Sequence, residues 1–267
     1  MSNLAVVQMN SSASVKKNLD DLENILAQAR DESIDLVVLP ENFAFMGLKE
    51  TDKLAVAESF GQGEIQQKIG ELAKKHNLWI IAGTIPVKTA SDRVRASSLV
   101  FDNKGKCAAR YDKIHLFDVR VSDTEAHQES LTIERGSDPV VVDTPIGRVG
   151  LTVCYDLRFP ELYRQLAMKG AELFSIPSAF TAITGAAHWD VLLRARAVEN
   201  LCYVLAANQG GLHENGRKTY GHSLIVEPWG KVIARLSKGV GIVSAQVDLQ
   251  RLQQLRRQFP CNTHHVL

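Results

Sequence analysis

The stretch GLTVCYDLRFPE, residues 150–161, joins a predicted β-strand to a predicted helix. Residues 148–153 form a β-rich, largely apolar run, and residues 160–169 read as an amphipathic helical segment that opens on a proline. Cys154 lies at the junction. A side chain at such a tight turn projects over the sheet edge, beside backbone N–H groups that have no helical partner. The stretch therefore indicates acyl transfer by a cysteine nucleophile, provided that the chain also supplies a base.

The rest of the chain alternates strand-like apolar runs with amphipathic helical patterns. Strands are predicted at residues 4–9, 35–39, 78–85, 96–101, 106–111, 140–142, 149–151, 173–176, 202–207, 223–226, 232–234 and 241–247. Helices are predicted at residues 15–29, 64–76, 161–169 and 189–201, and a last one is capped by Asp248. This mixture of βαβ units and hairpins favours a layered α/β architecture with sheets of mixed direction. We find no internal repeat or linker, so one domain over residues 1–267 is expected.

Three connections are longer than is usual between regular elements, at residues 42–63, 115–138 and 208–220. We expect these segments to be irregular. Because binding and catalytic residues often lie on loops that a rigid scaffold positions, we also expect function to concentrate there.

Composition excludes several classes of function. The 267-residue chain has a formal net charge of +1 and scattered basic residues, which does not support nucleic-acid binding. No apolar run approaches the roughly 18 residues that a membrane-spanning helix needs. The four cysteines, Cys107, Cys154, Cys202 and Cys261, show no paired spacing, which favours a reducing compartment and hence the cytoplasm. Because the sequence has neither a spaced set of metal ligands nor a glycine-rich phosphate loop, no metal and no cofactor is expected.

Two other predicted strand ends carry ionisable side chains. Glu41 follows the buried run LVVLP, residues 36–40, and Lys113 follows ARYD, residues 109–112. In layered α/β folds, active-site groups converge at the ends of strands. Taken singly, each of the two residues is better explained as a solvated surface charge, and a lone cysteine is more often a small core residue. Together with Cys154, they suggest a site.

Three segments together resemble the nitrilase-like carbon–nitrogen hydrolase superfamily: LPEN at 39–42, YDKIHL at 111–116 and VCYDLRFPE at 153–161. The resemblance covers nearly the whole chain, and the order and separation of the three segments make it specific. It implies a four-layer αββα sandwich of mixed sheets. It also implies a catalytic triad of Glu41, Lys113 and Cys154.

The chemistry of these three side chains suits amide hydrolysis. Glu41 can act as a general base for the Cys154 thiol, which attacks the amide carbon. Lys113 and the backbone N–H of Tyr155 can stabilise the oxyanion that forms. The protonated glutamate then gives its proton to ammonia, and a water activated by the same carboxylate hydrolyses the thioester.

The resemblance also implies a second glutamate in the loop after the lysine, where it helps to position the lysine and the substrate. We assign this role to Glu129, within QES at residues 128–130. Glu125 and Glu134 are nearby alternatives.

The string CYDLRFPE, residues 154–161, is similar to the subgroup of deaminated glutathione amidases and omega-amidases, in which this arginine faces the substrate. The guanidinium of Arg158 suits bidentate binding of a carboxylate, although an ion pair with Glu161 or Asp156 is a structural alternative. Residues 178–185, SAFTAITG, also look like the substrate-side loop of that subgroup. Thr184 in this loop is a second candidate contact, with a turn-forming role as its alternative.

The resemblance therefore implies a cysteine-dependent amidase that converts a small carboxylate-bearing amide into an acid and ammonia, with deaminated glutathione as the leading substrate. Omega-amidase activity on 2-oxoglutaramate-type substrates and nitrilase activity are the alternatives. A non-catalytic interaction scaffold on the same fold belongs to another class, and the presence of all three triad residues disfavours it. The resemblance further implies a homodimer.

Overall fold

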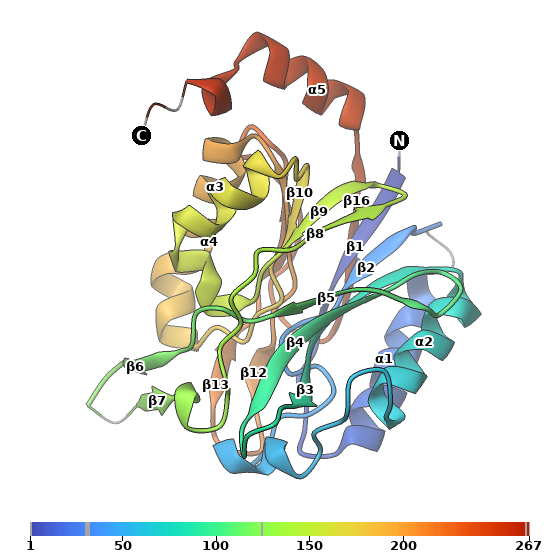
Figure 1. Ribbon diagram of the computed structural model, residues 1–267, viewed down its shortest axis with the longest axis vertical. Coiled ribbons are helices and arrows are strands. Elements are labelled where there is room, and N and C mark those ends of the chain that lie inside the picture. The colour runs from blue at the N-terminus through green and yellow to red at the C-terminus, as the bar shows by residue number, and fades with distance from the viewer. Residues whose placement is uncertain (1, 30–32, 124, 265, 267) are drawn as a thin grey trace.

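The computed structural model describes residues 2–29, 33–123, 125–264 and 266. Two six-stranded sheets form its centre (Figure 1). The first sheet has the order β16-β1-β2-β3-β4-β5. Its strands are β1 (Ser2–Gln8), β2 (Leu36–Val38), β3 (Trp79–Lys88), β4 (Val94–Phe101), β5 (Cys107–Asp112) and β16 (Gly241–Val247).

The second sheet has the order β15-β14-β11-β10-β9-β8. Its strands are β8 (Val141–Thr144), β9 (Gly147–Leu151), β10 (Leu173–Ser175), β11 (Tyr203–Ala206), β14 (Ser223–Val226) and β15 (Val232–Leu236). Both sheets are mixed: β1, β2 and β3 are parallel in the first, as are β9, β10 and β11 in the second, and the outer strands are antiparallel.

Alternating side chains give the first sheet two buried faces. In β1, Ala5 and Val7 belong to the apolar cluster formed with α1 (Val15–Ala29) and α2 (Glu64–His76). The intervening Leu4 and Val6 belong to a different cluster, which contains residues of the second sheet. Since successive side chains of a strand point to opposite faces, one face packs on helices and the other on a sheet.

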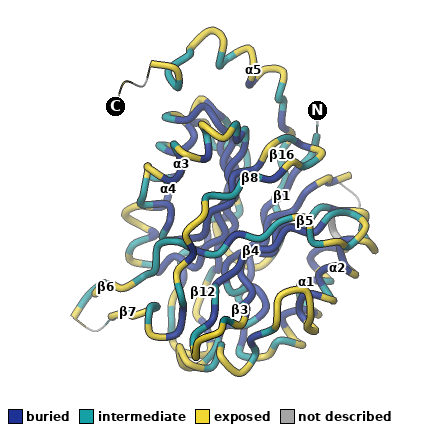
Figure 2. Tube along the Cα trace, in the orientation of Figure 1, coloured by how far each residue is buried: buried dark blue, intermediate teal, exposed yellow. Residues whose placement is uncertain are grey.

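The far face of the second sheet is covered by α3 (Pro160–Met168) and α4 (Ala182–Asn200). The structure is thus a four-layer αββα sandwich, as predicted (Figure 1). Figure 2 shows the buried trace concentrated in the two sheets and the exposed trace along α5 (Leu249–Gln258). No helix within the described residues is long and apolar enough to cross a membrane.

The expected start of one helix was wrong. Helix α4 begins at Ala182 rather than residue 189, so residues 182–185 are helical and not part of a loop. A Cβ on Gly185 would lie 2.3 Å from the Cβ of Tyr220, so close packing explains this glycine.

The three long connections also contain more regular structure than expected. Residues 115–138 include β6 (Asp118–Arg120), β7 (Ala126–Gln128) and the 3-10 turn η3 (Glu129–Leu131). Residues 208–220 form the hairpin of β12 (Gly210–Leu212) and β13 (Lys218–Tyr220), and residues 42–63 include the 3-10 turn η2 (Glu50–Leu54). Short hairpins with few apolar residues lack the periodic signal on which sequence prediction relies.

The sheet directions bring the predicted site residues together. Within the first sheet β2 and β5 run the same way, so Glu41 and Lys113 leave it at the same edge. Strand β9 of the facing sheet ends just before Cys154, which begins the 3-10 turn η4 (Cys154–Arg158).

Candidate active site

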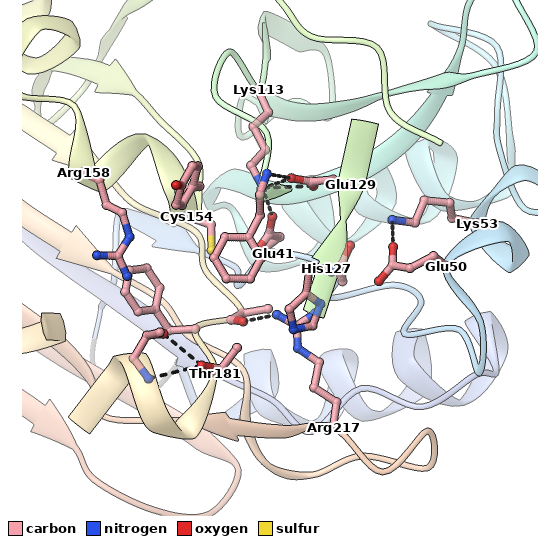
Figure 3. Close-up of a pocket in the computed structure, with 16 residues that line it drawn as sticks. Glu41, Glu50, Lys53, Lys113, His127, Glu129, Cys154, Arg158, Thr181 and Arg217 are labelled. Carbon is pink, nitrogen blue, oxygen red and sulfur yellow. Dashed lines mark hydrogen bonds and ion pairs between the residues drawn. The ribbon is translucent and has the colours of Figure 1, made fainter. Parts of the chain in front are cut away.

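A pocket of about 530 Å³, open to solvent, lies at this edge of the two sheets. All the predicted site residues line it: Glu41, Lys113, Glu129, Cys154, Tyr155, Arg158 and Thr184. Figure 3 shows the Lys113 ammonium between the carboxylates of Glu41 and Glu129, next to the Cys154 sulfur. The fold therefore gathers residues that are up to 143 positions apart in the sequence, from 41 to 184.

The Lys113 ammonium lies between two carboxylates. Its Nζ donates to Glu41 Oε1 at 2.8 Å and to both oxygens of Glu129, at 3.0 and 2.9 Å. Lys113 is 1% exposed. Burial lowers the pKa of Lys113, but the negative charges of Glu129 and Glu41 outweigh it and hold this pKa well above 10.5. The side chain is therefore a fixed positive charge at neutral pH.

Of the three candidate glutamates, it is Glu129 that contacts the lysine. Its Oε2 also accepts a 2.7 Å hydrogen bond from the backbone N–H of Phe117, which fixes the carboxylate. Glu125 instead binds His127 Nε2 at 3.0 Å, and Glu134 forms an ion pair with Arg95. Glu129 is the first residue of η3 and lines the pocket, whereas Glu125 and Glu134 do not line it.

Hydrogen bonds fix the backbone around Glu41, just after strand β2 ends. The backbone carbonyl of Glu41 accepts from Gln209 Nε2 at 3.0 Å, and the next residue, Asn42, donates its N–H to Thr84 Oγ1 at 2.9 Å. Gly83 allows strand β3 to lie close to the segment before Glu41, since a Cβ on Gly83 would stand 1.9 Å from the Pro40 carbonyl oxygen. Glu41 itself is 5% exposed.

The pKa of Glu41 is lower than that of an ordinary glutamate. Burial raises this pKa, but the charge of Lys113, its hydrogen bond and a hydrogen bond with the Cys154 thiol together bring it below the usual 4.5. The group is consequently ionised at neutral pH and free to accept a proton.

Cys154 occupies the turn that its sequence predicts. Its φ of 48° is a left-handed conformation that is uncommon for a residue other than glycine, and its N–H donates to the Pro177 carbonyl at 2.8 Å. Burial, followed by the charge of Glu41, raises the pKa of the thiol far above its usual 9.0, against the opposing effect of Lys113. In the free protein Cys154 is thus a neutral thiol.

One buried carboxylate ties the lysine segment to the cysteine turn. Asp156 is 0% exposed, and its Oδ2 accepts from Tyr111 Oη at 2.7 Å and from the Val153 N–H at 2.8 Å. Its Oδ1 accepts from the N–H of His115 at 3.0 Å and lies 2.7 Å from the Nδ1 of the same residue. Tyr111 and His115 flank Lys113 by two residues, and Val153 precedes Cys154. Asp156 therefore fixes the two segments relative to each other across the sheets.

Arg158 is oriented by aromatic rings and a histidine. Its guanidinium carbon lies 5.7 Å from the ring centre of Tyr155 and 5.6 Å from that of Phe180, and its Nη1 lies 3.2 Å from His188 Nδ1. Arg158 does not form the alternative ion pair with Glu161 or Asp156. No carboxylate among the described residues is paired with it. Its charge is thus available to an anion in the pocket.

Thr184 lies in the first turn of α4. Its backbone N–H donates to Oγ1 of the N-cap residue Thr181 at 3.2 Å, and the two hydroxyl oxygens are 2.9 Å apart. Both threonines line the pocket, so a contact with a bound molecule and a capping role are compatible for Thr184.

Several lining residues were missed by the sequence analysis: Asn42, Glu50, Lys53, Phe117, His127, Thr181 and Arg217. Most of them come from the three long connections, where no periodic pattern fixes a side chain's direction. Among the residues that the structure describes, no group of three or more His, Cys, Asp or Glu side chains is arranged to hold a metal ion.

An Asp156→Asn variant tests the link between the two segments. Asparagine has one acceptor oxygen, and its NH₂ group would face hydrogen-bond donors, so we expect the free energy of unfolding to fall by about 2 kcal/mol or more. Denaturant titration measures this loss. The matched control is Asp248→Asn at the N-cap of α5, where asparagine caps equally well and the change should stay within about 0.5 kcal/mol. Equal stability of Asp156→Asn and the wild type would show that the link is dispensable.

The chain is similar to known proteins over nearly its whole length. The family model described as carbon-nitrogen hydrolase matches residues 3–257. A deaminated glutathione amidase of Yersinia enterocolitica is 41% identical, over 98% of this chain and 92% of the relative. The crystal structure of the Caenorhabditis elegans NitFhit protein has a TM-score of 0.92 at 42% identity and aligns with 99% of this chain and 65% of that longer one. The structure of Saccharomyces cerevisiae Nit3, a member of branch 10 of the nitrilase superfamily, has a TM-score of 0.87 at 31% identity, over 97% of this chain and 94% of the other. This chain belongs to the carbon–nitrogen hydrolase family and is a hydrolase of carbon–nitrogen bonds other than peptide bonds.

Proposed function

We propose that this protein is a deaminated glutathione amidase with Cys154 as its nucleophile. The observation that carries the proposal is the buried Lys113 ammonium, bonded to Glu41 and Glu129 in the pocket that contains the Cys154 thiol. The choice of substrate is supported by relatives of that name, such as the Yersinia enterocolitica enzyme and the human one at 40% identity. Omega-amidase activity on 2-oxoglutaramate is the second candidate. The one observation that favours it is the guanidinium of Arg158, which is paired with no described carboxylate and suits one on a substrate.

The protonation states define the first step. Because the thiol is neutral and Glu41 is ionised, the proton moves from Cys154 to Glu41 as sulfur attacks the amide carbon. The attack forms a C–S bond and places negative charge on the former carbonyl oxygen. Lys113 and the N–H of Tyr155, the second residue of η4, stabilise that charge.

The second half of the reaction uses the same carboxylate. Protonated Glu41 donates to the amide nitrogen, the C–N bond breaks, and a neutral amine or ammonia leaves. Glu41 then removes a proton from water as the water oxygen attacks the thioester. The C–S bond breaks, Glu41 returns this proton to the departing sulfur, and the acid is released. Glu129 acts as a positioning residue, because it bonds Lys113 through both oxygens. Arg158 binds a carboxylate of the acyl group, and Thr184 lines the same pocket.

We also propose that the chain acts as a cytoplasmic homodimer. Several large apolar side chains are exposed, among them Val191 (62%) and Val198 on α4, and Trp229, which is in edge contact with Phe259. The four cysteines are free thiols, which suits a reducing compartment. A solution mass equal to the 29.5 kDa of one chain would contradict the dimer.

A substrate panel tests the proposed function. Deaminated glutathione and 2-oxoglutaramate both yield 2-oxoglutarate. The expected release of ammonia applies only to 2-oxoglutaramate, because the amide nitrogen of deaminated glutathione leaves as cysteinylglycine. Chromatography of the released acid therefore compares these two on one scale, and the same method follows the acids formed from simple nitriles. We expect the highest kcat/KM for deaminated glutathione. A strong preference for 2-oxoglutaramate would replace this function with omega-amidase, and turnover of nitriles alone would refute both.

The pH dependence tests the role of Glu41. A glutamate whose pKa is lowered in the folded state loses its charge, and the stability that this charge contributes, only as pH falls below 4.5. We therefore expect kcat/KM to stay level from neutral pH down to about 4.5 and to fall below it. Circular dichroism over the same range separates loss of the base from unfolding. An acid limb with an apparent pKa well above 4.5 in the folded protein would exclude Glu41 as the titrating base.

A further inference from the structure

A second cavity, which we call the outer groove, adjoins the Cys154 pocket. It has a volume of about 1280 Å³ and shares five lining residues with the pocket: Asn42, Glu50, Lys53, His127 and Arg217. Its other walls come from the segment after Glu41 and from the tip of the β12–β13 hairpin. A molecule bound at Cys154 can therefore continue into this groove.

The groove carries more positive than negative side chains. Lys49, Lys53, Arg217 and Lys218 line it, against Glu50 and Glu125. Both acids are already engaged, since Glu50 pairs with Lys53 at 2.7 Å and Glu125 lies 3.0 Å from His127 Nε2. The excess of cations makes the groove attractive to an anion.

Arg217 stands at the junction of the two cavities. Its Nη2 donates to the Ala179 carbonyl at 2.6 Å, and its buried Nε has no hydrogen-bond partner among the described residues. No described carboxylate is paired with it, in contrast to Lys53. A buried, unsatisfied guanidinium N–H is costly unless a ligand completes it, and a carboxylate is the anion whose geometry matches.

Hydrogen bonds hold Arg217 in place before anything binds. The hairpin tip is fixed to the opposite wall by Asn215 Nδ2, which donates to the Gly47 carbonyl at 2.8 Å. The backbone N–H of Arg217 donates to Asn215 Oδ1 at 2.9 Å, and Glu214 accepts from the Ala13 N–H at 3.1 Å. Such a preorganised cation binds an anion without first paying the entropy of ordering a loop.

The two arginines of the site lie on different sides of the nucleophile. Figure 3 shows Arg158 on one side of Cys154, and Arg217 with His127 and the Glu50–Lys53 pair on the other. An amide carbon placed at the sulfur would direct its acyl half toward one arginine and its amine half toward the other.

We propose that Arg217 is a specificity residue for the leaving group, and that it binds a carboxylate on the amine half of the substrate. This inference rests on the proposed function and deepens it: the preferred amides carry one carboxylate on the acyl half and another on an amino acid or dipeptide that departs. Deaminated glutathione is of this class, because its departing cysteinylglycine ends in a carboxylate. The ammonia released from 2-oxoglutaramate carries no carboxylate that Arg217 could bind.

A cycle of two enzymes and two substrates tests the proposal. The substrates are deaminated glutathione and its analogue with a C-terminal glycinamide, which differ in the terminal carboxylate alone. The wild type should favour the free carboxylate in kcat/KM by roughly 10- to 100-fold, as expected for a hydrogen bond between charged groups. Arg217→Gln should lose most of this preference, mainly through a slower reaction of the free acid.

The matched control is Arg148→Gln, which removes an equal charge from the β8–β9 hairpin, where Arg148 pairs with Asp143. It should keep the wild-type preference. Equal slowing of both substrates by Arg217→Gln would mean that Arg217 merely supports Ala179, and a wild type indifferent to the carboxylate would also overturn the inference. These results differ from failure of the proposed function, in which the wild type hydrolyses neither substrate.

Discussion

Burial of the Lys113 ammonium is the constraint on which the site depends. A charge removed from water is tolerated only where opposite charge and hydrogen bonds compensate it, and here Glu41 and Glu129 do so at 2.8 to 3.0 Å. The three residues come from the ends of β2 and β5 and from the segment after β7. Because the buried ammonium needs both carboxylates, the ion pairs fix the positions of these three chain segments relative to one another. The same arrangement keeps Glu41 ionised beside a neutral thiol, which is the pairing that general-base activation of a cysteine needs.

The two sheets supply the rigid frame for that arrangement. Lys113 directly follows a strand of the first sheet and Cys154 follows a strand of the second, so relative movement of the sheets would separate them. Asp156 opposes this movement, since it accepts hydrogen bonds from Tyr111 and His115 on one side and from Val153 on the other. The turn η4 thus carries both the proposed nucleophile, Cys154, and the carboxylate of Asp156, which fixes its position relative to Lys113.

The sequence predicted those parts of the fold that depend on interactions between residues close together in the chain. Helix α2, strands β14 and β16 and the Asp248 cap of α5 agree with the sequence pattern, because periodicity and capping are local. The motifs also identified the residues that meet in the pocket. Arg217 could not be found in this way, since its position depends on a hairpin whose tip is held by the Gly47 carbonyl, 168 residues away in the chain. The early start of α4 was hidden for a similar reason: Gly185 reads as a loop residue but makes room for Tyr220.

The central claim is that Cys154 is the nucleophile, and kcat/KM of a Cys154→Ala variant on deaminated glutathione tests it most directly. Cys107→Ala is the control, because that thiol lies outside the residues that line the pocket. If Cys154 forms the thioester, its removal should lower kcat/KM by on the order of 10⁴-fold or more, whereas Cys107→Ala should remain near the wild type. A folded Cys154→Ala protein that retains wild-type turnover would contradict the account.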